Sequence, residues 1–232
     1  MSYDIDTIKN CCERLAGIRY LDTVDSTNQE ARRIASQEAC DGLIVLAGRQ
    51  SAGRGRMGRS WSNGGDDAIA MSIVLRPSIK PENVSMLTII AALAVSEGIE
   101  RACGLKTDIK WPNDLKHDGR KLCGILSESV FSGNDFFSII GIGINVNTEI
   151  FPEELKDIAA SITQFTGKKE NRESIITESI NSFFRYYDIL CMDQNLNSLT
   201  AEYNEKCITE GGINKFGELI MPDGSLKRSG EV

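Results

Sequence analysis

The sequence predicts an α+β fold with a mixed, mainly antiparallel sheet and helices. Three observations carry this prediction. Apolar runs of strand length recur along the chain, several are joined by hairpin-type turns, and helical patterns separate only some of the strands. A doubly wound fold would place a helix between nearly every pair of strands, so that class is excluded.

Local signals place the elements in order. Apolar spacing predicts a short helix over 5–15 and a strand over 18–24. Ser26 and Gln29 have the spacing of a capping box, so a helix is predicted from Thr27 to Cys40. Further strands are predicted over 42–48, 68–75, 107–111, 122–130, 136–145 and 217–221. Further helices are predicted over 84–103, 152–158, 172–190 and 196–206.

Turn-forming residues mark the connections between these elements. Gly104 is predicted to end the long helix that precedes it. Turns are predicted over 61–67, 117–120, 132–134 and 222–225. The chain has no internal repeat, low-complexity segment or long linker.

Composition limits the function before any motif is considered. At 232 residues and 41% hydrophobic, the chain can bury one substantial core. A net charge of −7 disfavours a general nucleic-acid binder, so no DNA partner is expected. The seven cysteines are scattered without a Cys-x-x-Cys pair, which predicts neither a disulfide framework nor a zinc site. The acidic N-terminus and the lack of an apolar run of about 18 residues predict a cytoplasmic protein without a membrane partner.

A basic loop is the strongest local signal for function. Residues 53–59 read Gly-Arg-Gly-Arg-Met-Gly-Arg, with Arg49 and Gln50 before them and Trp61 after them. Arginine stays protonated and offers a planar set of donors to phosphate oxygens, and glycine lets backbone N–H groups approach the same anion. The loop is therefore predicted to bind phosphates.

Other interpretations of this loop are weaker. The spacing Gly53-x-Gly55-x-x-Gly58 matches the dinucleotide-binding fingerprint, but turn formers and a strand follow it where that fold needs a helix. A Walker phosphate loop would need Gly-Lys-Ser or Gly-Lys-Thr after the glycines. A solvated basic hairpin is the remaining alternative, and the conformational entropy cost of three glycines argues against it.

Further motifs lie at strand ends, and each has a purely structural alternative. Residues 110–114, Lys-Trp-Pro-Asn-Asp, present Asn113 and Asp114 at the tip of a strand, although an Asn-Asp turn can also cap itself. Glycines at 124, 141 and 143 interrupt apolar strands, which indicates either close approach of a ligand or a bulge. His117 is the only histidine and lies in a polar turn, so a Ser-His-Asp or Cys-His mechanism has no well-placed base.

Five motifs together resemble those of biotin protein ligases in order and approximate spacing. They are 26–28 (Ser-Thr-Asn), 50–56 (Gln-Ser-Ala-Gly-Arg-Gly-Arg), 110–114 (Lys-Trp-Pro-Asn-Asp), 121–126 (Lys-Leu-Cys-Gly-Ile-Leu) and 141–147 (Gly-Ile-Gly-Ile-Asn-Val-Asn). The resemblance implies a fold like the catalytic core of class II aminoacyl-tRNA synthetases. It implies an enzyme that joins biotin to ATP, giving biotinyl-5′-adenylate and pyrophosphate. The biotinyl group would then pass to a lysine of the biotin carboxyl carrier domain of a carboxylase.

The same resemblance assigns roles to individual residues. The residues implied in biotin binding are Ser26, Thr27, Asn28, Gln50, Gly53, Arg54 and Gly124. Those implied in binding ATP and the adenylate are Arg54, Arg56, Arg59, Trp61, Lys121 and Asn145. Lys121 and Arg56 would be catalytic, and Asp114 would help to hold Mg²⁺. These types suit the chemistry, because attack of one anion on another needs neutralised charge and alignment more than a protein nucleophile.

The sequence departs from the family pattern at both ends. The segment before the first motif is too short for a winged helix, so we expect a ligase that is not itself a repressor. The small C-terminal β-barrel of the family looks shortened, which divides the chain into a catalytic unit over 1–206 and a C-terminal β segment over 207–232. Cys123 stands where the family commonly has alanine, and the pocket is expected to tolerate it. Homodimers are common in the family, and this sequence itself identifies no interface.

Three alternatives to this activity stay open from the sequence. A lipoate or octanoate ligase of the same superfamily is disfavoured by the motif at 110–114 and by the basic loop. A non-catalytic sensor of biotin or its adenylate is suggested by the shortened C-terminus. A nucleic-acid module that uses the arginine loop is disfavoured by the acidic charge balance.

Overall fold

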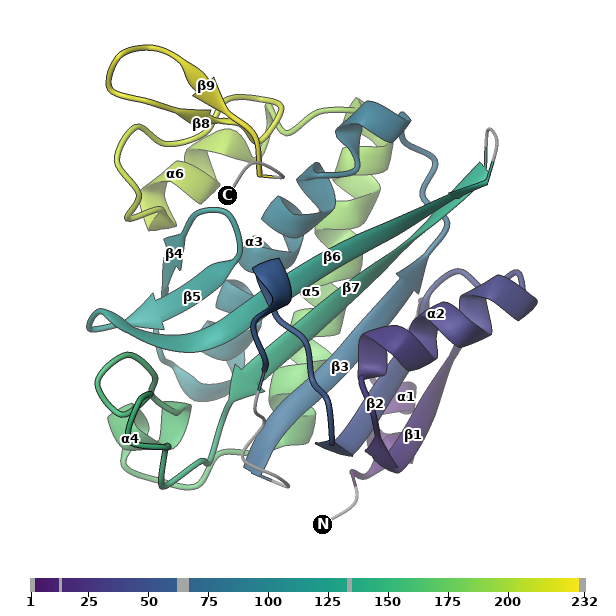
Figure 1. Ribbon diagram of the computed structural model, residues 1–232, viewed down its shortest axis with the longest axis vertical. Helices are drawn as coiled ribbons and strands as arrows, with labels where there is room; N and C mark the ends of the chain where they lie inside the picture. The colour runs from purple at the N-terminus through teal and green to yellow at the C-terminus, as the bar shows by residue number, and fades with distance from the viewer. Residues whose placement is uncertain (1–2, 13, 62–66, 133–134, 230–232) are drawn as a thin grey trace.

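A seven-stranded sheet with helices on both faces forms the body of the protein (Figure 1). The computed structural model describes residues 3–12, 14–61, 67–132 and 135–229. The strands are β1 (Gly17–Val24), β2 (Leu43–Gln50), β3 (Ala68–Leu75), β4 (Asp108–Lys110), β5 (Asp114–His117), β6 (Arg120–Ser132), β7 (Asp135–Asn145), β8 (Leu219–Ile220) and β9 (Leu226–Lys227). The helices are α1 (Ile5–Asn10), α2 (Thr27–Gln37), α3 (Met86–Cys103), α4 (Ile162–Thr166), α5 (Arg172–Asp193) and α6 (Thr200–Lys206), with short 3₁₀ turns η1 (Arg56–Gly58) and η3 (Pro81–Asn83). Within the described residues, no helix is long and apolar enough to span a bilayer.

The sheet is mixed and mainly antiparallel, as the sequence predicts. Its strand order is β1-β2-β3-β7-β6-β5-β4, and β8 and β9 form a separate small sheet. β1 and β2 are parallel because α2 carries the chain back between them, and the other neighbouring pairs of the large sheet are antiparallel. This topology confirms the predicted α+β class.

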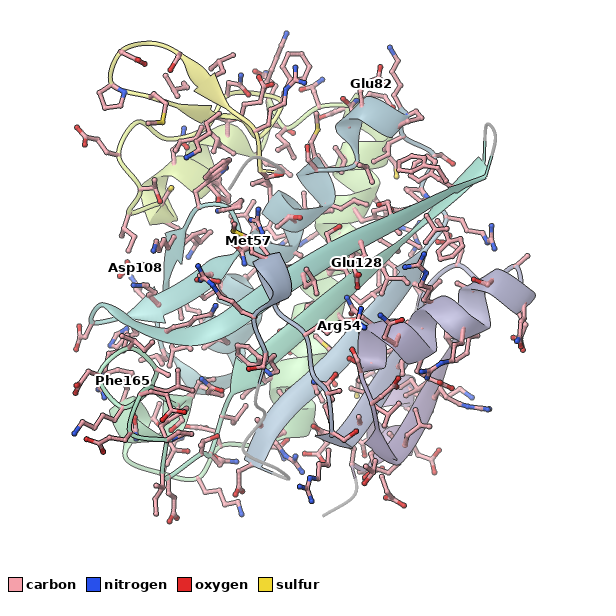
Figure 2. The ribbon with its side chains drawn as sticks, in the orientation of Figure 1. Arg54, Met57, Glu82, Asp108, Glu128 and Phe165 are labelled. Carbon is pink, nitrogen blue, oxygen red and sulfur yellow. The ribbon has the colours of Figure 1, made fainter. Side chains whose placement is uncertain are left out.

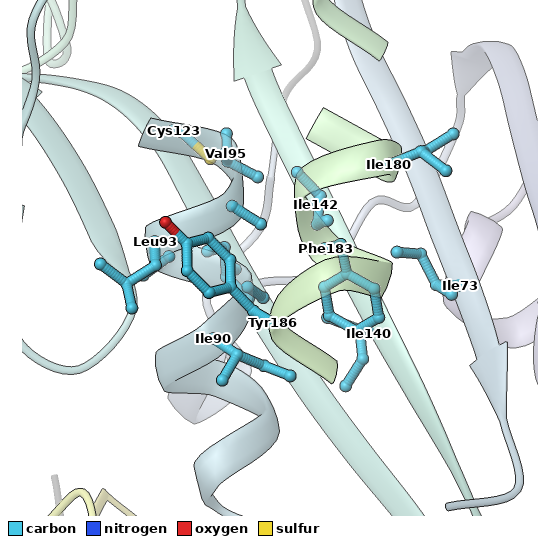
Figure 3. Close-up of a cluster of buried hydrophobic side chains, with 14 of the residues drawn as sticks. Ile73, Ile90, Leu93, Val95, Cys123, Ile140, Ile142, Ile180, Phe183 and Tyr186 are labelled. Atoms are coloured by element: carbon cyan, nitrogen blue, oxygen red, sulfur yellow. The ribbon is translucent and has the colours of Figure 1, made fainter. Parts of the chain in front are cut away.

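Alternation along the strands gives the sheet two cores. Ile44 and Leu46 of β2 belong to the larger core, which α3 and α5 cover, whereas Val45 belongs to a smaller one under α2. Figure 3 shows part of the larger core, which includes Phe183 of α5 and Ile140 of β7. The two cores hold α2 and the α3–α5 pair on opposite faces.

Helix α2 covers only part of its face. Its small residues pack on Val74 of β3 and Ile139 of β7. On the same face, Ser72 lies two residues before Val74 on β3 and pairs with Gly141, which lies two residues after Ile139 on β7. Gly143 lies two residues further along β7. A strip without bulky side chains therefore lies on the sheet beside the first residues of α2.

Three predictions about local structure are wrong. The segment 152–158 forms turns rather than a helix, because its last residue is hydrogen-bonded to β6. Lys121 N–H of β6 donates to Ile158 O at 2.8 Å. Residues 107–120 form two strands, β4 and β5, where the sequence predicts one strand and a turn. Ser26 precedes α2 as predicted, but its side chain makes no capping hydrogen bond.

Most other elements are confirmed with shifted ends. The long helix α3 ends at Gly104, which adopts a left-handed conformation with φ 72°. The segment 5–15 is helical only over α1, and β8 is shorter than the strand predicted over 217–221. The predicted turns over 61–67 and 132–134 include residues that lie outside the described part of the chain.

Candidate active site

One pocket on the α2 face brings together most of the predicted site residues. The empty space in and in front of it, which includes open solvent, is about 450 Å³. Its lining comprises Ser26, Thr27, Asn28, Gln50, Arg54, Gly55, Arg56, Trp61, Asn113, Lys121, Gly124, Ile125, Leu126, Gly141, Ile142 and Gly143. Four of the predicted residues lie outside this lining, namely Gly53, Arg59, Asp114 and Asn145.

The basic loop is a hairpin folded across the sheet, in front of β6 in Figure 2. Trp61 N–H donates to Gly53 O at 2.9 Å, and Gly55 N–H donates to Arg59 O at 2.7 Å. A Cβ on Gly53 would come 2.4 Å from Trp61 O, so the hairpin closes only around glycine. The alternative of a solvated hairpin is right about the shape, but Arg54 and Arg56 line the pocket.

Trp61 lies on the glycine strip of the sheet. A Cβ on Gly143 would come 2.3 Å from its Cε2 atom, and one on Gly124 would come 3.1 Å from Cζ3. These two glycines are paired across β6 and β7, so together they make room for the indole. Trp61 Nε1 is buried and has no hydrogen-bond partner among the described residues. Within the described residues, packing on the glycines therefore positions the indole without a hydrogen bond from Nε1.

The end of the pocket beside α2 is polar and hydrogen-bonded. Thr27 donates from both its backbone N and its Oγ1 to Gln50 Oε1, at 2.8 and 3.1 Å. Asn28 Nδ2 donates to Leu126 O at 3.3 Å and to Glu128 Oε2 at 2.7 Å. Asn28 therefore lines the pocket with an amide whose N–H groups already have protein acceptors. This end offers hydroxyl and amide groups to a ligand.

The other end of the pocket is charged. Lys121 Nζ lies 2.6 Å from Asp114 Oδ1 and 5.7 Å from the centre of the Trp61 ring. Arg56 Nη1 donates to Asn113 Oδ1 at 3.1 Å, and Nη2 donates to the carbonyl of Ser229. Burial lowers the pKa of the Arg56 guanidinium, and the nearby Asp114 carboxylate acts in the opposite direction. These cations suit an anionic ligand.

The comparisons with known proteins agree with this geometry. The family described as "Biotin/lipoate A/B protein ligase family" matches residues 20–145, more than half of the chain. The chain belongs to this family. Its five motifs all contribute residues to the pocket lining or lie beside it.

Several relatives within the family are similar over long stretches. The bifunctional ligase/repressor BirA of Bacillus spizizenii is 45% identical over 72% of this chain and 53% of that protein. The biotin–[acetyl-CoA-carboxylase] ligase of Mycobacterium tuberculosis is 31% identical over 84% of this chain and 74% of that protein. The solved biotin protein ligase from Aquifex aeolicus in complex with biotin and ATP is 27% identical, with a TM-score of 0.80, and 94% of this chain and 97% of that chain are covered. The chain spans about half the length of the BirA proteins that it matches.

In this member of the biotin/lipoate ligase family, the predicted residues outside the pocket lining have clear positions. Asn145 is buried at the end of β7, where it pairs with Ala68. Arg59 is exposed on the returning arm of the hairpin. Cys123 is fully buried in the larger core, because strand alternation turns it away from Gly124 and the pocket. The difference between Cys123 and an alanine at this position therefore affects packing in the larger core and leaves the pocket lining unchanged.

Sequence reasoning missed two residues next to the pocket. Ser72 Oγ lies 2.8 Å from Thr27 Oγ1 and 2.7 Å from Asn28 Oδ1, and Glu128 accepts from Asn28. The available signals were a serine at 72 inside an apolar strand and a polar run, Ser127–Ser129, that interrupts the next apolar strand but one. Their role could be found only after the strands were paired.

The described residues contain no group of three or more His, Cys, Asp or Glu side chains that could hold a metal ion. Asp114 is a single partly buried carboxylate whose Oδ1 accepts from Lys121 and, at 3.1 Å, from Asn113 Nδ2. Mg²⁺ commonly takes one or two protein carboxylates together with substrate phosphates and waters. This donor set fits a Mg²⁺ ion that arrives with a nucleotide, and does not fit a resident metal centre.

Proposed function

We propose that this chain activates biotin with ATP to biotinyl-5′-AMP and transfers biotin to a lysine of a biotin carboxyl carrier domain. The observation that carries the proposal is the order of groups along one pocket. Thr27 and Gln50 lie at the polar end, the apolar indole of Trp61 on the glycine strip follows, and Lys121 stands at the cationic end. Biotin has the same order of parts, namely a ureido ring, a methylene chain and a carboxylate.

The site residues take the following roles in the proposed first step. Ser26, Thr27 and Gln50 hold the ureido ring, and the methylene chain of biotin runs beside the Trp61 indole toward Lys121, where burial contributes about 0.8 kcal/mol per CH₂. Lys121 brings the biotin carboxylate and the α-phosphate together by neutralising both. A carboxylate oxygen then attacks the α-phosphorus, and the bond to the pyrophosphate oxygen breaks.

Charge stabilisation is the main contribution of the loop. Arg54 and Arg56 hold the negative charge that builds on the departing pyrophosphate, each contact contributing about 1.5–3 kcal/mol. Trp61 packs beside the nucleotide. Arg59 and Asn145 contact the nucleotide from outside the pocket lining. Mg²⁺ bound to the ATP phosphates would supply further positive charge, with Asp114 as its protein ligand.

In the second step, the amine of the carrier lysine attacks the acyl carbon of the adenylate, and AMP leaves. No residue of this chain needs to become covalently modified, and the carrier lysine keeps the biotinyl group as an amide. The pocket residues keep the mixed anhydride away from water until the carrier arrives.

The proposal extends to the whole chain. Residues 1–206 would form the catalytic unit, and 207–232 the C-terminal β segment, whose small sheet is separate from the main one. A cytoplasmic location, a homodimeric state and the absence of a DNA partner remain part of the same proposal, and the net charge of −7 supports the last of these.

Incubation with ATP and one acid at a time tests the activity. We expect pyrophosphate release with biotin and little with lipoate or octanoate, followed by labelling of a carrier domain. Equal rates with all three acids would favour the lipoate or octanoate ligase. Tight adenylate binding without a labelled carrier would favour a sensor.

A further inference from the structure

A series of polar contacts runs from Gln50 in the pocket to Glu128 on β6. It starts at Gln50 Oε1, which lies 3.1 Å from Thr27 Oγ1. Ser72 Oγ is 2.8 Å from Thr27 Oγ1 and 2.7 Å from Asn28 Oδ1. Asn28 Nδ2 then donates to Glu128 Oε2 at 2.7 Å. Thr27, Asn28 and Ser72 are all buried, so these hydrogen bonds are protected from water.

The three oxygen–oxygen contacts in this series share only two hydroxyl protons. Gln50 Oε1 and Asn28 Oδ1 can only accept, whereas Thr27 and Ser72 carry one proton each. Two protons can serve only two of the three contacts at a time, and both then lie between these four side chains. One contact is therefore short of a donor, and Thr27 Oγ1 keeps a lone pair for a donor from a ligand.

Glu128 lies at the end of this series of contacts that is farther from the pocket, and it fixes the direction in which the hydrogen bonds point. As a carboxylate it can only accept, so the amide of Asn28 must turn its NH₂ toward β6 and its Oδ1 toward Ser72. The carbonyl of Leu126 supports the same orientation through a longer contact of 3.3 Å. Gly141 makes the placement possible, because a Cβ there would come 2.2 Å from Asn28 Oδ1. Figure 2 labels Glu128 on β6, and neither it nor Ser72 lines the pocket.

We propose that Glu128 is a positioning residue for ligand selectivity, acting through Asn28 and Ser72 on the hydroxyl of Thr27. The inference rests on the proposed function and deepens it. A ligand with an N–H group, such as a cyclic urea, supplies the donor that this series of contacts lacks. An acid of similar length whose far end has no N–H leaves the lone pair of Thr27 without a partner, which carries a desolvation cost.

The test compares Glu128→Gln with Glu128→Asp. A glutamine can accept or donate, so the Asn28 amide can turn and present its NH₂ to Ser72. The Ser72 proton then goes to Thr27 Oγ1, where it competes with a ligand N–H for that oxygen. We expect Glu128→Gln to weaken biotin binding roughly three- to tenfold, the equivalent of one hydrogen bond, with ATP affinity unchanged. Glu128→Asp still only accepts, and we expect it to bind biotin within about threefold of the unaltered chain.

Glu218→Gln is the matched control. Glu218 accepts from Asn214 Nδ2 at 2.9 Å and from Arg228 Nε at 3.1 Å, so it also forms an Asn–Glu pair, placed in the C-terminal part of the chain and outside the pocket lining. It should leave biotin and ATP affinities unchanged. Calorimetric titrations with biotin, octanoate and ATP, together with thermal unfolding, give the readouts. A drop in the preference for biotin over octanoate separates positioning from a general loss of structure.

Two outcomes would overturn the inference alone. One is Glu128→Gln binding biotin as tightly as the unaltered chain. The other is a loss of biotin, octanoate and ATP binding in equal proportion, which would mean a purely structural role. Failure of the unaltered chain to bind biotin would instead overturn the proposed function, and the inference with it.

Discussion

Lys121 Nζ and Asp114 Oδ1 lie 2.6 Å apart across the paired strands β6 and β5. Asp114 thus holds the ammonium group at the charged end of the pocket. The pair is partly exposed, with side-chain exposures of 31% and 22%, so it contributes only about 0–1 kcal/mol to stability. Its value is positional, because it leaves a cation where a carboxylate and a phosphate must meet.

Replacement of this ammonium should slow the first chemical step without unfolding the protein. For Lys121→Ala we expect adenylate formation to fall by about 10²–10³, the effect of removing one group that stabilises transition-state charge. Pyrophosphate release with saturating biotin and ATP measures the rate. Lys9→Ala on α1 is the control, since Lys9 is exposed and lies outside the pocket lining. An unchanged rate in Lys121→Ala would remove the assigned role.

Arg56→Ala should separate nucleotide chemistry from biotin binding. Its guanidinium reaches Asn113 at the charged end, so its loss removes a phosphate contact of about 1.5–3 kcal/mol, or roughly 10- to 150-fold in adenylate formation. Biotin affinity should stay within about twofold of the unaltered chain. Arg32→Ala on the exposed side of α2 controls for the lost charge. Parallel losses of rate and biotin affinity would contradict the assignment.

Motif spacing predicted which residues line the pocket better than it predicted the contacts between these residues. Thr27, Gln50, Arg56 and Lys121 were found from sequence because residue type and order identify them in a family. The partners Ser72 and Glu128 were missed, because their importance depends on strand register.

The errors in secondary structure have a related cause. The helix predicted over 152–158 fails because tertiary pairing with Lys121 overrides local pattern. The strand β5 is four residues long and carries too few alternations to be recognised. Long periodic segments such as α3 were predicted nearly in full, because their apolar pattern extends over several turns.

Stability should fall above about pH 9. Burial raises the pKa of the Cys12 thiol from 9.0 to about 11, and it also raises the pKa of the Cys103 and Cys123 thiols. The unfolded chain therefore releases these protons first, so each thiol lowers the free energy of unfolding by about 1.4 kcal/mol per pH unit between the two pKa values. Urea midpoints from pH 7.5 to 10.5 with reductant should decline.

Cys12→Ala provides the check on that cause. Its midpoint should depend less steeply on pH above 9 than that of the unaltered chain, although the cavity lowers its stability at neutral pH. Cys11→Ala is the matched control, because Cys11 is exposed. The same alkaline slope in Cys12→Ala and in the unaltered chain would rule out this thiol as a source.

Gly143→Ala should damage the nucleotide side of the site while sparing the fold. The added methyl would come 2.3 Å from Trp61 Cε2, so the indole must leave the glycine strip. Trp61 Nε1 has no hydrogen-bond partner among the described residues, so its displacement breaks no hydrogen bond and should change the unfolding temperature little. We expect at least a tenfold loss in adenylate formation, measured by pyrophosphate release. Gly17→Ala in β1 is the control, because its methyl would meet only Leu43 Cδ1 at 3.8 Å, and equal behaviour of the two variants would show that the indole position does not matter.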